Sequence, residues 1–190
     1  MCKVLVTGMS GTGKSSVLRE LAQRGYETVD TDSDAWSEWA SSDSDAGSSD
    51  WIWREDRITD LLESHADGVL YVSGCKSNQG KFYDHFDAVV LLSAPAETIL
   101  ERISTRDTND YGKSPHERQQ VLYHLKTIEP LLRSSATIEL DAGRPLSTVT
   151  DELVAIGEAL AGREDDTAHP CRRPRQPSGR IAVSREMPSG

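Results

Sequence analysis

The chain has 190 residues, enough for one domain with a substantial hydrophobic core. Its formal net charge of −10 disfavours nucleic acid and anionic membrane surfaces as partners, because both are bound through clustered Lys and Arg. No apolar run approaches the roughly 18 residues of a membrane span. The three cysteines share no metal-ligand spacing and fit reduced thiols. We therefore expect a cytoplasmic monomer or homodimer that acts on small molecules.

The N-terminal segment carries the most specific motif. Residues 8–15, GMSGTGKS, fill every fixed position of the phosphate-binding pattern G-x-x-x-x-G-K-[S/T]. Hydrophobic periodicity predicts a buried strand over Lys3–Thr7 and an amphipathic helix over Lys14–Arg24. A strand, this loop and a helix in succession indicate a nucleotide-binding loop. The alternative is a glycine-rich turn before an ordinary helix.

Each position of this loop has an expected role. The glycines let the backbone turn its N–H groups toward an anion. Lys14 is expected to contact the β- and γ-phosphates of ATP, and the Ser15 hydroxyl to bind Mg²⁺. The predicted nucleotide-binding residues of this segment are Gly8, Gly11, Thr12, Gly13, Lys14, Ser15 and Ser16.

Two carboxylates follow the second predicted strand. This strand covers Tyr26–Val29, and Asp30 and Asp32 come directly after it. In a parallel nucleotide-binding sheet, the carboxyl ends of the strands face the ligand crevice. We expect Asp30 to hold a water bound to Mg²⁺, and Asp32 to accept a hydrogen bond from an acceptor hydroxyl as its general base. The alternative is a solvated acidic turn that caps the next helix.

An acidic segment leads from this strand to the next helix. Residues 27–50 contain eight acids and no base, and residues 41–49 predict a mobile loop because nothing in them can be buried. Residues 50–54, DWIWR, predict the first turn of a helix that runs to about Ser64. Arg54 is a candidate to bind an anionic acceptor beside a tryptophan wall. Alternatively, Trp51 belongs to the core and Arg54 pairs with a neighbour such as Asp50.

Three more strands are predicted over Val69–Ser73, Ala88–Leu92 and Ala136–Leu140. The first of them ends without the acidic residue that many ATPases use there to hold the metal. Asp30 and Asp32 are therefore the main candidates for the carboxylates of the site. Cys75, just beyond this strand, is either a reactive thiol at the rim of the site or a buried inert one.

The helix after the fourth strand ends in two arginines. Arg102 and Arg106 lie four residues apart, on one helix face, just before a lid-like loop over residues 106–116. Guanidinium groups placed in this way stack on a base and neutralise phosphate charge. We expect Arg106 and Arg118 to supply charge in the transition state as the loop closes. Alternatively, Arg102 and Arg106 are exposed to solvent and form ion pairs with neighbouring acidic residues.

The end of the chain has a different composition. After one long helix from His116 to about Leu132 and a last helix over Leu146–Leu160, residues 163–190 are rich in Pro, Gly, Ser and Arg. We therefore divide the chain into a P-loop domain, residues 1–162, and a disordered tail. The five arginines of residues 171–185 leave two alternatives, a contact with the acidic body or with a polyanion.

The order of elements over residues 3–160 resembles the adenylate kinase and shikimate kinase group of P-loop small-molecule kinases. The segment RGYETVDTD (24–32) is similar to the second strand of shikimate kinases, which implies Mg²⁺ for its first strand-end Asp and acceptor hydroxyls for its second. Trp53-Arg54 resembles the aromatic–arginine pair of that family, which implies that Arg54 holds an acceptor carboxylate. Shikimate kinases have three glycines after the third strand, and of these only Gly74 is present here. Arg118 lies one helical turn from the position of their second carboxylate-binding arginine.

The segment LERISTR (100–106) looks more like adenylate kinases, which implies adenine stacking by Arg102 and phosphate contact by Arg106. The expected fold is a three-layer α/β P-loop NTPase with a five-stranded, largely parallel sheet, in the order 2-3-1-4-5 by resemblance. The expected activity is ATP- and Mg²⁺-dependent transfer of the γ-phosphoryl group to a hydroxyl compound or a nucleoside monophosphate. A regulatory nucleotide-binding protein, or a slow ATPase without an acceptor, is the alternative.

Overall fold

The computed structural model describes residues 1–41, 49–107 and 110–167. The mobile loop predicted over residues 41–49 therefore falls almost entirely outside the described residues, and so does most of the arginine-rich tail.

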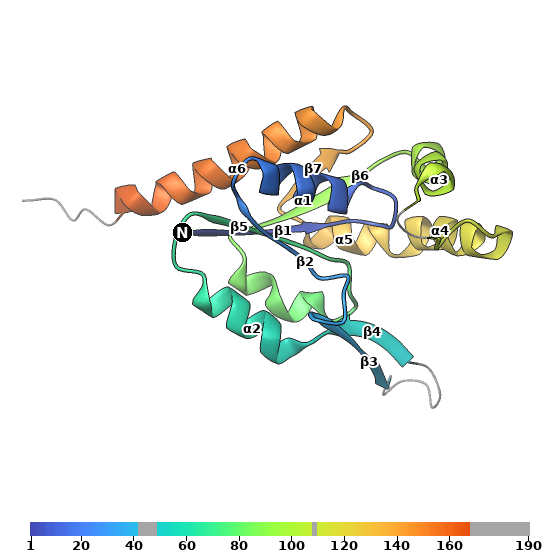
Figure 1. The fold of residues 1–190 in the computed structure, drawn as a ribbon, viewed down its shortest axis with the longest axis horizontal. Helices are drawn as coiled ribbons and strands as arrows, with labels where there is room; N and C mark the ends of the chain where they lie inside the picture. Colours follow the sequence, from blue (N-terminus) through green and yellow to red (C-terminus); the bar gives the residue numbers. More distant parts are fainter. Residues whose placement is uncertain (42–48, 108–109, 168–190) are drawn as a thin grey trace, which may run out of the picture.

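Five parallel strands form the central sheet (Figure 1). They are β1 (Cys2–Thr7), β2 (Glu27–Asp30), β5 (Val69–Ser73), β6 (Ala88–Ser93) and β7 (Ile138–Asp141). Their order is β2-β5-β1-β6-β7, and every neighbouring pair is parallel. The predicted order 2-3-1-4-5 is confirmed. It places the first strand, and the loop that follows it, at the centre of the sheet.

Helices cover both faces of the sheet and complete three layers (Figure 1). One face carries α1 (Lys14–Gln23) and α6 (Leu146–Thr167). The other carries α2 (Glu55–Ser64), the 3₁₀ helix η1 (Gln79–His85) and α5 (Glu129–Ser135). At the carboxyl end of the strands lie α3 (Ala96–Thr105) and α4 (Pro115–Thr127).

The strand sequences specify this layering. Successive side chains of a strand point to opposite faces, so Val4 and Val6 of β1 pack with α1 and α6, whereas Leu5 packs with α2 and η1. All three side chains are fully buried. A continuous apolar run is the pattern of a strand covered on both faces.

The segment predicted to open a helix at Asp50 forms a strand instead. β3 (Ser37–Ser41) and β4 (Ser49–Trp53) pair as an antiparallel hairpin, with Trp39 opposite Trp51, and α2 begins only at Glu55. The prediction was wrong because aromatic and β-branched side chains favour a pleated strand over a helix. The hairpin projects beyond the central sheet, beside the carboxyl end of β2 (Figure 1).

Two other boundaries differ from the prediction. The helix expected from His116 to Leu132 is divided between α4 and α5 at Ile128, because Pro130 in the first turn of α5 has no N–H to continue the helical bonds. The last helix continues to Thr167, so residues 163–167 of the predicted tail are helical. Within the described part of the chain, no helix is long and apolar enough to cross a membrane.

Candidate active site

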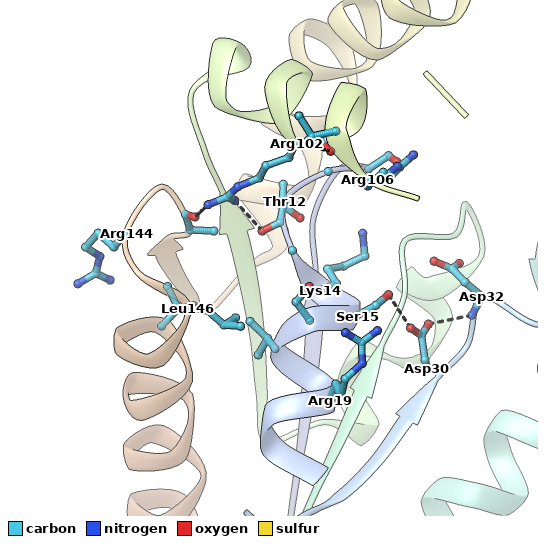
Figure 2. Close-up of a pocket in the computed structure, with 18 residues that line it drawn as sticks. Thr12, Lys14, Ser15, Arg19, Asp30, Asp32, Arg102, Arg106, Arg144 and Leu146 are labelled. Atoms are coloured by element: carbon cyan, nitrogen blue, oxygen red, sulfur yellow. Dashed lines mark hydrogen bonds between the residues drawn. The ribbon is translucent and has the colours of Figure 1, made fainter. Parts of the chain in front are cut away.

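A cavity of about 560 Å³ lies at the carboxyl ends of β1 and β2 (Figure 2). Its walls come from the loop after β1, the first turns of α1, the end of β2, the end of α3 and the segment that joins β7 to α6. The polar side chains that line it are Ser10, Thr12, Lys14, Ser15, Ser16, Arg19, Asp30, Asp32, Arg102, Thr105, Arg106 and Arg144.

The loop over residues 8–15 has the backbone of an anion cradle. Gly8 and Gly13 have φ angles of 148° and 98°, values that L side chains rarely adopt. A Cβ on Gly8 would lie 2.4 Å from the carbonyl oxygen of Leu92, so this position accepts no side chain. Gly13 is the N-cap of α1, whose first turn holds no acidic residue. The positive end of the helix dipole is therefore available to an anion in the cavity.

Lys14 lies within this cradle (Figure 2). Its Nζ donates hydrogen bonds to the carbonyl oxygens of Gly8, at 2.8 Å, and Met9, at 3.2 Å, and its side chain is largely buried. The Thr12 hydroxyl also donates to the Met9 carbonyl, at 2.9 Å. These bonds keep the ammonium group and the loop in one arrangement, close to where phosphate oxygens would lie.

A hydroxyl and a carboxylate meet at the opposite side of the loop. Ser15 Oγ donates to Asp30 Oδ2 at 2.7 Å, and Asp30 Oδ1 accepts from the backbone N–H of Asp32 at 3.2 Å (Figure 2). Mg²⁺ in nucleotide sites takes one or two carboxylates together with waters and substrate phosphates. The oxygen donors present here fit that ion. Within the described residues, no group of three or more His, Cys, Asp or Glu offers a fuller metal cage.

Asp32 has a cationic partner that the sequence did not indicate. Lys76, three residues beyond β5, places its Nζ 2.6 Å from Asp32 Oδ1. The Lys76 side chain is largely buried, whereas the Asp32 side chain is half exposed toward the cavity. Lys76 thus fixes the direction in which the carboxylate points.

Two of the predicted arginines line the wall opposite these carboxylates. Arg102 donates to the Ala142 carbonyl at 2.7 Å and to the Thr12 carbonyl at 3.5 Å, and so joins the phosphate loop to the segment before α6. Arg106 donates to the Tyr111 carbonyl at 2.6 Å and to the Ser10 hydroxyl at 3.4 Å. Burial lowers the pKa of the Arg106 guanidinium. Its charge therefore lies in a partly dehydrated place, where it acts more strongly on a nearby phosphate.

The remaining predicted site residues lie outside the cavity lining. Arg118 is exposed on α4. Arg54 pairs with Glu38 at 2.8 Å rather than with Asp50, and also donates to the Asp34 carbonyl. Gly74 acts through its missing side chain, because a Cβ there would lie 2.4 Å from Thr31 Oγ1 and 2.9 Å from the indole of Trp53.

A family model described as an AAA domain matches residues 4–122 of the chain. The chain belongs to this AAA domain family. Among curated proteins, the sequence search found no match.

Solved structures similar to this AAA domain protein include small-molecule kinases. A gluconokinase from Sinorhizobium meliloti 1021 superposes with a TM-score of 0.59 at 22% identity, over 88% of this chain and 98% of that one. A shikimate kinase from Acinetobacter baumannii, solved with shikimate, gives 0.57 at 22% identity, over 84% and 94%. A shikimate kinase from Bacteroides thetaiotaomicron gives 0.58 at 13% identity, over 83% and 98%. At these identities the likeness is one of fold, and it confirms the P-loop kinase fold expected from the sequence.

Two basic residues of the cavity were missed at the level of sequence. Arg19 lies four residues after Ser15, so helical spacing already places both on one face of α1. Arg144 comes from the segment between β7 and α6, where it forms two hydrogen bonds of 2.6 Å with Glu152. Nothing in the local sequence indicates that this segment closes the cavity, since its position depends on the packing of α6.

Proposed function

We propose that this protein is an ATP- and Mg²⁺-dependent kinase, which transfers the γ-phosphoryl group of ATP to a small acceptor. The observation that carries the proposal is the line of contacts from Ser15 to Asp30, to Asp32 and on to Lys76. It connects a loop suited to phosphates with an oriented carboxylate at the cavity edge. A regulatory nucleotide-binding protein needs the loop but not the second carboxylate; in a slow ATPase that carboxylate would act on water, and the acceptor panel below separates this case.

In this proposal the nucleotide and the metal occupy the loop side of the cavity. The backbone N–H groups of residues 8–16 and the Lys14 ammonium bind the phosphates, and Arg102 lies beside the base. Ser15 and Asp30 hold Mg²⁺, which would neutralise charge on the phosphates when bound. Phosphoryl transfer needs little covalent help from the protein, so the positions of these groups provide most of the catalysis.

The acceptor occupies the other side. Asp32 accepts the hydrogen bond of the attacking hydroxyl and takes its proton, and Arg106 faces the transferred phosphoryl group across the cavity. Arg118 joins them only if α4 moves toward the cavity, as a lid would. Arg54 and Gly74 support the acceptor wall, Arg54 through its pair with Glu38 and Gly74 by admitting the Trp53 ring.

The cytoplasmic location, the oligomeric state and the division at residue 162 stay predictions.

The test compares ATP consumption with and without acceptors. Mg²⁺-dependent ADP formation is measured alone and with a panel of hydroxyl compounds and nucleoside monophosphates. We expect at least one acceptor to raise ADP formation about tenfold or more and to appear as its phosphorylated product. ADP formation that stays the same across the panel would instead assign the site to an ATPase or a nucleotide switch.

A further inference from the structure

We infer that the acceptor is an uncharged or positively charged hydroxyl compound, whose flat or ring-shaped apolar face lies on Trp39 and Trp51 of the β3–β4 hairpin. The inference rests on the proposed kinase function and specifies its second substrate. It is carried by three features of the described residues: a path of contacts from the phosphate loop to the hairpin, an exposed aromatic surface, and the pairing of Arg54 and Lys76 with acids.

The contact path places the hairpin within reach of the transferred phosphoryl group. Lys76 Nζ, bound to Asp32 at 2.6 Å, lies 5.8 Å from the centre of the Trp51 ring. The Trp51 ring in turn lies 5.2 Å from the Trp39 ring, inclined at 53°. Asp32 itself lines the cavity together with Ser15 and Asp30. A molecule that offers a hydroxyl to Asp32 therefore has the tryptophan pair beside it.

The tryptophan pair is presented on a fixed support. Trp53 lies on the same face of the hairpin as Trp39 and Trp51 by the strand register, and it is fully buried. Its Nε1 donates to Thr31 Oγ1 at 2.6 Å, and its backbone exchanges two 3.0 Å hydrogen bonds with the Asn78 side chain. The hairpin is thus attached to the end of β2 and to the segment between β5 and η1.

The aromatic surface becomes more exposed with distance from this anchor. Trp53 is 0% exposed, Trp51 is half-buried and Trp39 is 68% exposed. Leaving a large indole in water forgoes about 2 kcal/mol of burial, so a tryptophan pair in this position suits the apolar face of a sugar, a base or another ring.

The charges around the hairpin disfavour an anionic acceptor. Arg54, which would be the natural partner of an acceptor carboxylate, is held 2.8 Å from Glu38. Lys76 is held by Asp32. A carboxylate that displaced either acid would leave a second negative charge beside its own, which costs free energy in a partly buried place.

A neutral or cationic molecule meets no such obstacle. Asp50, at the start of β4, accepts a hydrogen bond from the Ser77 hydroxyl and places one more carboxylate on this wall. Asp34 adds another, exposed between β2 and the hairpin. An ammonium group on the acceptor would be attracted by these carboxylates, and a neutral polyol can donate hydrogen bonds to them.

The charge of the phosphorylated product tests the inference even while the acceptor itself is unidentified. The full chain is incubated with Mg²⁺, γ-labelled ATP and a deproteinised small-molecule extract. Labelled products are then resolved by anion exchange at pH 8, against glucosamine 6-phosphate, glucose 6-phosphate and 6-phosphogluconate. We expect the main product to elute with or before glucose 6-phosphate.

The other outcomes distinguish a failure of the kinase function from a failure of the inference about the acceptor. A main product that elutes with 6-phosphogluconate or with nucleoside diphosphates would overturn the inference and leave the kinase function standing. Label released only as inorganic phosphate would overturn the kinase function, and the inference with it.

Substitution of Trp39 tests the aromatic surface. Once the acceptor has been recovered from its labelled product, we expect Trp39→Ala to raise the KM for that acceptor about 5- to 100-fold, the range of one lost stacking contact, with kcat within about twofold. Trp39→Phe should restore most of the affinity. Tyr123→Ala removes a comparably exposed aromatic residue, 62% exposed, from α4 and should leave KM unchanged. An unchanged KM in Trp39→Ala would remove the hairpin from the acceptor site.

Discussion

The nucleotide wall of the cavity and the proposed acceptor wall beside it are built in different ways. The nucleotide wall comes from one continuous stretch, residues 8–16, whose glycine backbone and helix N-terminus already form a cradle. The proposed acceptor wall begins at Asp32, on the cavity edge, and continues outside the cavity lining through segments far apart in the sequence, since Asp32 meets Lys76, and Trp53 meets Asn78 and Thr31. Phosphates are the same in every nucleotide, so a short local motif suffices for them. A particular acceptor has to be recognised by groups that only the folded chain brings together.

The comparison predicts that the largest loss of activity follows from a change in the nucleotide wall. Lys14→Met removes the charge that faces the phosphates, and kcat/KM should fall about 10³-fold, because one well-placed donor is worth that much in the transition state. Its thermal unfolding should stay close to that of the parent protein, as followed by circular dichroism. Full ADP formation by this variant would remove the loop from catalysis.

A smaller and more specific loss of activity is expected from a change at Asp30, which with Ser15 forms the proposed Mg²⁺ site. Asp30→Asn keeps the size of the side chain but removes the charge beside Ser15. The Mg²⁺ concentration for half-maximal activity should rise about 10- to 100-fold, measured by ADP formation over a Mg²⁺ titration. Asp60→Asn, an exposed position on α2, is the matched control and should titrate like the parent. Equal titration curves for both variants would contradict the role of Asp30.

A change in the acceptor wall should weaken acceptor binding without weakening nucleotide binding. Trp53→Phe removes the hydrogen bond to Thr31 and part of a fully buried ring, so the free energy of unfolding in urea should fall by about 1–2 kcal/mol. The KM for the acceptor should rise, whereas the affinity for ADP, measured by calorimetry, should stay the same. Trp36→Phe alters another tryptophan of the same apolar cluster and should affect both quantities less. Parallel losses of ADP and acceptor binding would show that the two walls are not independent.

The smallest effect is expected in the scaffold outside both walls. Hydrogen bonding from Arg133 holds the pKa of Glu139 below its ordinary value of 4.5. A carboxyl whose pKa is lowered by folding stabilises the protein above its unfolded pKa, and this stability disappears as pH falls through the folded pKa. Because both side chains are partly exposed, Glu139→Gln should cost less than about 1 kcal/mol at pH 7.

The pH dependence provides the control for this variant. The melting temperatures of Glu139→Gln and the parent protein should differ at pH 7 and converge toward pH 3, while activity at pH 7 is unchanged. A difference that is the same at both pH values would mean that the lost stability comes from packing rather than from charge.

Most of the fold followed from local patterns. Apolar runs and the turn residues between them identified all five strands of the sheet, and alternation with helices indicated their parallel pairing, because short-range sterics and the crossover rule leave few arrangements. The β3–β4 hairpin was missed, since the tryptophans of residues 51–53 fit either a helix start or a strand until their cross-strand partners are known. The break at Ile128 was also missed, although Pro130 is a local signal for it.

The sequence by itself determined the phosphate loop, the two strand-end aspartates and the P-loop kinase fold, because each depends on residues close together in the chain. Only the tertiary structure decided what each charge is paired with. In the folded chain Lys76 pairs with Asp32, and Glu38 pairs with Arg54. These pairs join residues 44 and 16 positions apart, which no local periodicity encodes. In the proposed function, GMSGTGKS binds the donor of the phosphoryl group, and these pairings, together with the surface around Trp39 and Trp51, select its recipient.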